Sequence, residues 1–134
     1  MLEAGLREPS LVAVVDDDRQ VRQSVERLVA SLGYAVQGFA SAAEYLRSGR
    51  LSQIACLIAD MQMPGMTGLE LHAELRARGY DTPTILVTAY PSDDVRAEAL
   101  AKGVKGYLVK PFREGELIEY LRTIVGGAAT GGSA

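Results

Sequence analysis

Short, unbroken apolar runs alternate along the chain with longer segments in which apolar side chains recur every three or four residues. The apolar runs are typical of strands buried on both faces of a parallel sheet, and the periodic segments predict helices. Each strand is followed by a helix, so we predict right-handed crossovers and a doubly wound α/β fold with five parallel strands and five helices. The predicted strands are residues 11–15, 35–39, 55–60, 84–88 and 106–109.

Capping residues and glycines indicate where the predicted helices begin and end. Ser41 with Glu44 three residues later has the spacing of a capping box, and Ser92 is a further candidate N-cap. Gly33 follows the first periodic segment, where helices commonly stop, and proline and glycine in residues 61–67 predict a loop. The predicted helices span 19–32, 42–48, 68–78, the segment from Ser92 to Lys102, and a last segment marked by apolar residues from 117 to 125.

Composition limits the chain to one domain and a few functional classes. With 134 residues, 48% of them hydrophobic, it can enclose one core, and a net charge of -3 gives no basic surplus for direct nucleic-acid binding. The single Cys56 excludes an internal disulfide and is expected to be a buried strand residue in a reducing compartment. No apolar stretch approaches the roughly 20 residues of a membrane span, and no signal-peptide core is present, so we expect a cytoplasmic protein with no membrane contact.

The two ends of the chain differ from the rest in composition. We expect residues 1–10 to form a flexible N-terminal extension, residues 11–125 the folded domain, and residues 126–134, rich in Gly and Ala, a linker or a frayed tail. The linker-like composition favours a domain that belongs to a longer protein. A stand-alone domain remains the alternative.

Polar residues occupy the carboxyl ends of four predicted strands or the positions just after them. They are Asp16, Asp17, Asp60, Thr88 and Lys110. In a doubly wound sheet ligands bind beyond these strand ends, so we expect the side chains to meet at one edge. Converging carboxylates repel one another and recruit a hard cation, for which Mg²⁺ is the natural choice. A carboxylate such as Asp60 is then suited to attack a phosphoryl group, whose oxygens the amine and the hydroxyl can hold.

Each of these residues taken alone has an ordinary interpretation. Acids before a helix often serve only as N-caps, which is the expected role of Asp18, and a single Asp after a strand is often a turn former. A lone lysine is usually solvated, and a lone threonine is usually an ordinary strand residue. The coincidence of four suitable strand ends in one chain favours a site.

The combined motifs resemble the receiver domain of two-component response regulators. The resemblance is carried by Val14 to Asp18, Asp60 to Gly68, Thr88-Ala89 and Lys110 to Phe112, and it covers nearly the whole chain, from about residue 11 to 125. It implies a flavodoxin-like sheet of strand order 2-1-3-4-5 and a Mg²⁺ cofactor.

The resemblance also implies a role for each matching residue. Asp60 is the expected phosphoacceptor, Asp16 and Asp17 are the acidic pair around Mg²⁺, and the backbone carbonyl of Gln62 is a further metal ligand. Lys110 is expected to bind the phosphoryl group and to precede a cis peptide bond to Pro111. The expected switch pair is Thr88 and Tyr107, which would transmit phosphorylation to the partner-binding face.

Partners follow from the same resemblance. A sensor histidine kinase or a small phosphodonor is expected to supply the phosphoryl group, and the domain catalyses only its own phosphorylation and dephosphorylation rather than acting as an enzyme. We expect phosphorylation-dependent homodimerisation through the fourth helix and fifth strand. We also expect an effector domain after residue 125, so that the chain would be the receiver part of a transcriptional regulator. His72 is expected to be a surface residue and not a phosphodonor.

Two other functions compete with this interpretation. Phosphatases of the haloacid-dehalogenase type also use an aspartyl nucleophile, Mg²⁺ and a lysine, and Asp16 to Asp18 contains their D-x-D spacing. Gln20, however, occupies the position where those enzymes have Thr or a hydrophobic residue. The second alternative is a receiver-like module that binds partners without phosphorylation, which the complete set of acids, threonine and lysine argues against.

Overall fold

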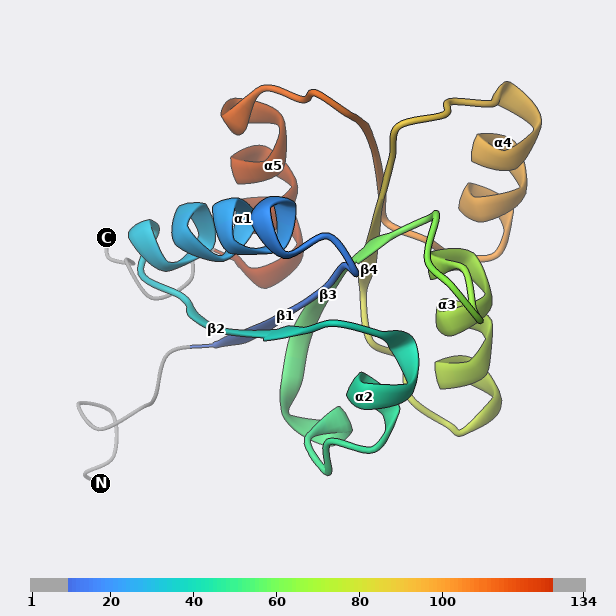
Figure 1. Ribbon diagram of the computed structural model, residues 1–134, viewed down its shortest axis with the longest axis horizontal. Helices are drawn as coiled ribbons and strands as arrows, with labels where there is room; N and C mark the ends of the chain where they lie inside the picture. The colour runs from blue at the N-terminus through green and yellow to red at the C-terminus, as the bar shows by residue number, and fades with distance from the viewer. Residues whose placement is uncertain (1–9, 127–134) are drawn as a thin grey trace.

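The computed structural model describes residues 10–126, which fold into one parallel sheet flanked by helices (Figure 1). The strands are β1 (Leu11–Val15), β2 (Ala35–Phe39), β3 (Ile54–Asp60), β4 (Thr84–Thr88) and β5 (Gly106–Val109). The helices are α1 (Arg19–Ser31), α2 (Ala42–Leu46), α3 (Gly68–Ala77), α4 (Asp93–Ala101) and α5 (Glu114–Leu121). A short 3-10 helix, η2 (Leu51–Gln53), precedes β3, and a π-helical turn, η3 (Arg122–Gly126), follows α5.

The sheet has the order β2-β1-β3-β4-β5, and all neighbouring strands are parallel. Helices α1 and α5 cover one face of the sheet, and α2, α3 and α4 cover the other (Figure 1). This architecture confirms the predicted doubly wound fold and its strand order. Because β1 and β3 are adjacent at the centre of the sheet, the residues that follow them are brought together.

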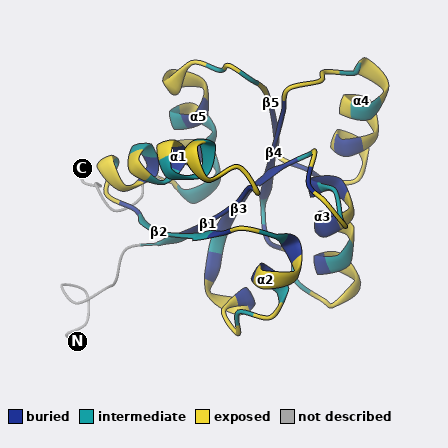
Figure 2. Ribbon diagram, in the orientation of Figure 1, coloured by how far each residue is buried: buried dark blue, intermediate teal, exposed yellow. Residues whose placement is uncertain are grey.

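Two apolar cores, one on each face of the sheet, hold the layers together. The central strands are buried along most of their length (Figure 2), as expected for strands covered on both sides. On the α1 and α5 face, Val29 and Leu117 pack against β1 and β3, and on the other face Leu71 and Tyr45 do so. Cys56 lies in the first of these cores, fully buried as predicted, and burial raises the pKa of its thiol to about 12.

The predicted element bounds differ from the structure at only a few places. Helix α2 ends at Leu46 rather than at residue 48, and η2, a single turn too short to show periodicity, was not predicted. Gly33 and Gly103, with φ of 98° and 95°, follow the ends of α1 and α4 in the left-handed conformation expected there. Except for Ser10 and Gly126, the predicted N-terminal extension and C-terminal tail lie outside the described residues.

No helix within residues 10–126 has the length and apolar character needed to cross a bilayer.

His72 was predicted to be a surface residue, and this prediction is wrong. Its side chain is only 2% exposed, because it lies on the same buried side of α3 as Leu71 and Leu75. Its Nε2 lies 3.1 Å from the carbonyl oxygen of Lys102, and its Nδ1 lies 3.0 Å from the Thr84 hydroxyl. The ring therefore joins α3 to β4 and to the end of α4, and both of its nitrogens have partners.

This burial makes the stability of the fold depend on pH. Burial lowers the pKa of His72, the charge of Arg76 lowers it further, and the hydrogen bond to Lys102 opposes them without reversing the shift. The unfolded chain therefore takes up a proton first as pH falls below about 6.5, the ordinary value for histidine. The free energy of unfolding should fall from there down through the folded pKa, by no more than about 1.4 kcal/mol per pH unit, the slope for one proton.

Urea unfolding of the parent and of His72→Gln between pH 8 and pH 5 measures this effect. The variant should lack this component of the acid-induced loss, so the difference between the two unfolding free energies should shrink as pH falls. Parallel pH profiles for the two proteins would contradict the assignment.

Candidate functional site

The turn after β1 holds an acidic pair in a fixed conformation. The Asp16 carboxylate is buried and accepts a hydrogen bond of 2.8 Å from the backbone N–H of Asp18. The Asp18 side chain in turn accepts from the N–H groups of Gln20 and Val21, so it is the N-cap of α1, as predicted. With Asp18 used as the cap, Asp16 and Asp17 are left for the site.

Arg22 supports this turn, a role that sequence reasoning missed. Its Nη1 donates a 2.7 Å hydrogen bond to the backbone carbonyl oxygen of Asp16, and its Nε lies 3.8 Å from a carboxylate oxygen of Glu26. Bonds from a charged donor are stronger than neutral ones, so Arg22 fixes the direction of the main chain at Asp16. The one feature of the sequence that could have indicated this role is the position of Arg22 in the first turns of α1, shortly after the acidic residues.

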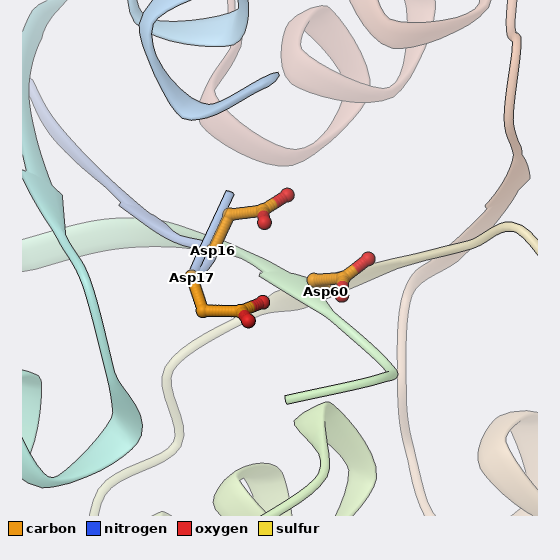
Figure 3. Close-up of side chains that lie close together, drawn as sticks. All are labelled: Asp16, Asp17 and Asp60. Atoms are coloured by element: carbon orange, nitrogen blue, oxygen red, sulfur yellow. The ribbon is translucent and has the colours of Figure 1, made fainter. Parts of the chain in front are cut away.

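Asp60, the last residue of β3, meets the acidic pair and Lys110 at the carboxyl edge of the sheet. The carboxylates of Asp16, Asp17 and Asp60 have oxygens within 4.8 Å of one another and point to the same side (Figure 3). Lys110 Nζ lies 2.8 Å from Asp60 Oδ1 and 3.5 Å from Asp16 Oδ2. Four of the residues predicted from the strand ends are therefore brought together.

The proximity of these groups changes their proton affinities. Burial raises the pKa of Asp16, and the neighbouring carboxylates of Asp60 and Asp17 raise it further, while the Asp18 N–H and Lys110 oppose them. Burial lowers the pKa of Lys110, but the contact with Asp60 and the charge of Asp16 outweigh burial and leave it above its usual value. Lys110 therefore stays protonated and offsets part of the excess negative charge.

The arrangement fits a hard divalent cation. Three carboxylates share one small space, and Asp60 Oδ1 is buried without any well-aligned hydrogen bond from the described residues, its one close partner being the Lys110 ammonium. One positive charge cannot balance three negative ones. Mg²⁺ prefers carboxylate oxygens and keeps several waters, which the exposed Asp17 side of the site can accommodate.

The loop after β3 brings the backbone close to Asp60. An added Cβ at Gly68, the first residue of α3, would lie 2.7 Å from the Asp60 carbonyl oxygen, so only glycine fits there. Thr67 and Glu70 form a capping box that starts α3 directly behind this contact. Of the loop methionines, Met63 is buried against the core.

The predicted switch residues, Thr88 and Tyr107, are both buried. The Thr88 hydroxyl donates to Gln62 Oε1 at 3.1 Å and accepts from the Tyr90 N–H at 3.0 Å. Tyr107 is 8% exposed, and its hydroxyl accepts a hydrogen bond of 3.4 Å from the Ser92 N–H at the start of α4. Tyr107 is thus in an inward position, and the peptide bond from Lys110 to Pro111 is cis, as expected.

Comparison with known proteins agrees with this geometry. The family described as the response regulator receiver domain matches residues 12–122. The chain belongs to the receiver-domain family. It is 38% identical over 121 residues, or 90% of its length, to the transcriptional regulatory protein FixJ of Azorhizobium caulinodans.

Solved receiver-domain structures share the fold. The chemotaxis protein CheY4 of Vibrio cholerae has a TM-score of 0.78 and 32% identity, over 86% of this chain and 98% of that one. A response regulator receiver protein from Burkholderia phymatum has a TM-score of 0.74 and 38% identity, over 87% and 94% of the two chains. Receiver domains are signalling domains of two-component systems, so the phosphatase alternative loses its support.

The chain spans about half the length of the curated relatives it matches. It covers 57% of FixJ and 55% of the response regulator protein TodT of Pseudomonas putida, to which it is 33% identical. The similarity therefore covers the receiver part of those regulators.

Removing one carboxylate from the acidic cluster should make the fold more stable in the absence of metal. Because the pKa of Asp16 is raised, its charged form is less favourable in the folded chain than in the unfolded chain at neutral pH. Asp16→Asn should therefore unfold at higher urea concentration than the parent in a chelator. Adding Mg²⁺ should stabilise the parent by about 1.4 kcal/mol at ten times its dissociation constant, and the variant by less at the same concentration.

The matched control is Asp81→Asn, whose side chain is 94% exposed and lies away from the cluster. It should leave both the chelator value and the Mg²⁺ increment unchanged. An equal Mg²⁺ increment in the parent and in Asp16→Asn would show that Asp16 does not contribute to cation binding.

Proposed function

We propose that this receiver domain is a phosphorylation-dependent switch that accepts a phosphoryl group on Asp60. The observation that supports this most directly is the 2.8 Å contact between Asp60 and Lys110 inside a partly buried acidic cluster. In this proposal Asp60 supplies the nucleophilic oxygen, and Lys110, in contact with the Asp60 carboxylate, would balance charge on the transferred phosphoryl group. The protein catalyses only its own phosphorylation and dephosphorylation.

In the proposed reaction a carboxylate oxygen of Asp60 forms a bond to phosphorus in line with the leaving group. The bond from phosphorus to the donor's histidine nitrogen or acyl oxygen breaks, and the leaving group keeps the electron pair. Lys110 then balances charge on the phosphoryl oxygens. Hydrolysis by water later restores the free carboxylate and releases inorganic phosphate.

Asp16, Asp17, Asp60 and the backbone carbonyl of Gln62 are the residues that would hold Mg²⁺. The bound cation supplies Lewis-acid stabilisation of the phosphoryl oxygens. The contribution of the chain is to keep the carboxylates in place: Asp18 and Arg22 fix the turn that presents Asp16. Asp60 is fixed by its position at the end of a central strand.

The signal would pass outward through Thr88 and Tyr107. Phosphorylation adds charge and acceptor oxygens beside Thr88, which attracts its hydroxyl. Movement of Thr88 would vacate space next to the inward ring of Tyr107 and so alter the surface formed by α4 and β5. A sensor histidine kinase is the proposed phosphodonor, and an effector domain like those of the longer relatives is the proposed recipient of the signal.

Labelling with a small phosphodonor tests the reaction. In the presence of Mg²⁺, acetyl phosphate should add one hydroxylamine-sensitive phosphoryl group to the parent and none to Asp60→Asn. Asp16→Asn should react about ten- to a hundredfold more slowly, the range expected for a weakened metal site. Intact-mass spectrometry measures all three, with Asp81→Asn as the control that should react like the parent.

Label on Asp60→Asn would place the phosphoacceptor elsewhere. A parent that takes no label would instead favour the receiver-like module that works without phosphorylation.

Homodimerisation through α4 and β5 is the proposed consequence. Two apolar side chains on these elements are partly exposed, Leu100 at 44% and Val109 at 40%. Light scattering after size-exclusion chromatography should give a higher mass with Mg²⁺ and beryllofluoride, a phosphoryl mimic, than without them. Leu100→Asp should stay monomeric under both conditions. A monomeric parent in both conditions would refute the dimer.

A further inference from the structure

A chain of hydrogen bonds joins the loop after β3 to the loop after β4. Gln62 Oε1 accepts a bond of 3.1 Å from the Thr88 hydroxyl, whose oxygen accepts a bond of 3.0 Å from the backbone N–H of Tyr90. Thr88 is fully buried, whereas Gln62 is exposed. The contact therefore reaches from the surface to the buried end of β4.

The number of protons on Thr88 makes this contact significant. A threonine hydroxyl carries a single proton, so it can donate only one hydrogen bond at a time. In the structure that proton is directed to Gln62. The proposed switch requires the same proton for a phosphoryl oxygen on Asp60, two residues before Gln62. The two acceptors compete for one donor.

We propose that Gln62 is a positioning residue that holds Thr88 in its resting arrangement. This inference rests on the proposed function of Asp60, because the competing acceptor is the phosphoryl group. Gln62 takes no part in bond making through its side chain. It raises the free energy needed to move Thr88, and so sets how much of the unphosphorylated protein already has the switched arrangement.

The effect reaches further than Thr88 because the following segment is held at both ends. The Tyr90 N–H bonds to Thr88, and the Ser92 N–H bonds to the inward Tyr107 hydroxyl. The Tyr90 side chain is 74% exposed and provides little anchorage of its own. Loss of the Gln62 contact should therefore make Thr88 more mobile and reduce the protection of the Tyr90 amide against hydrogen exchange.

Substitution of Gln62 should leave the fold intact. Its side chain is on the surface, and within residues 10–126 its only hydrogen bond is the one to Thr88. Gln62→Met keeps the approximate length of the side chain and removes the acceptor. Gln62→Glu keeps an accepting oxygen, removes the amide donor and adds a negative charge. The two variants therefore differ in whether an accepting oxygen is present, the feature on which the proposal depends.

Amide hydrogen exchange of Tyr90 in unphosphorylated, metal-free protein, followed by NMR, tests the proposal. Gln62→Met should speed the exchange roughly two- to tenfold, the range for the loss of one hydrogen bond. Gln62→Glu should exchange like the parent. Thr88→Val, which removes the hydroxyl itself, provides the upper limit, and Gln53→Met, the same substitution near the opposite end of β3, should have no effect.

Two outcomes would overturn the proposal. One is that the Tyr90 amide exchanges at the same rate in Gln62→Met as in Gln53→Met. The other is Gln62→Glu exchanging as fast as Gln62→Met, which would show that the accepting oxygen is not what holds Thr88.

The test is independent of whether Asp60 is phosphorylated. Reaction of the parent and of Asp60→Asn with acetyl phosphate provides the second measurement: the parent should be labelled, and Asp60→Asn should not. Labelling together with unchanged Tyr90 exchange would reject Gln62 as the positioning residue and retain the phosphoacceptor. Absence of label on the parent together with faster Tyr90 exchange in Gln62→Met would reject the proposed function and retain the contact.

Discussion

The ion pair between Lys110 and Asp60 is the interaction on which the site depends. Three carboxylates within 4.8 Å of one another would repel strongly, and two of them are buried. Lys110 Nζ, at 2.8 Å from Asp60 and 3.5 Å from Asp16, supplies a permanent positive charge between them. Without it, the carboxyl edge of the sheet would hold a cluster of uncompensated charge, so the pair is what lets the fold keep its acids in place without a cation.

Sheet geometry determines which side chains can build this cluster. Asp16 follows β1 and Asp60 ends the adjacent β3, but Lys110 follows β5, and β4 separates it from β3. Neighbouring strands are about 4.8 Å apart, so Lys110 must reach across roughly two strand spacings. A long side chain is needed at the end of β5 and a short one at the end of β4, where Thr88 stands. The lengths of the side chains therefore follow the strand order.

This regularity explains how much could be predicted. The strands, the helix-terminating glycines and the convergence of Asp16, Asp60 and Lys110 follow from local patterns and from the rule that parallel strands end at one edge. The burial of His72 was missed because it depends on the partners of the ring, the Thr84 hydroxyl on β4 and the Lys102 carbonyl at the end of α4, which apolar spacing does not reveal. The contacts of Arg22 with Asp16 and of Gln62 with Thr88 depend on loop conformation and side-chain rotamers, which apolar periodicity does not encode.

The hydrogen bonds divide the site into a part that is ready and a part that is restrained. Lys110 already contacts the carboxylate of Asp60, the proposed phosphoacceptor, so the proposed chemistry requires no large movement of this residue. Thr88 has its proton directed to Gln62 and its oxygen bonded to Tyr90, so it must exchange partners before it can respond. The proposed phosphorylation and the proposed signalling therefore have separate energetic requirements, and a substitution of the Gln62 side chain would act on the second while leaving the carboxylates and Lys110 in place.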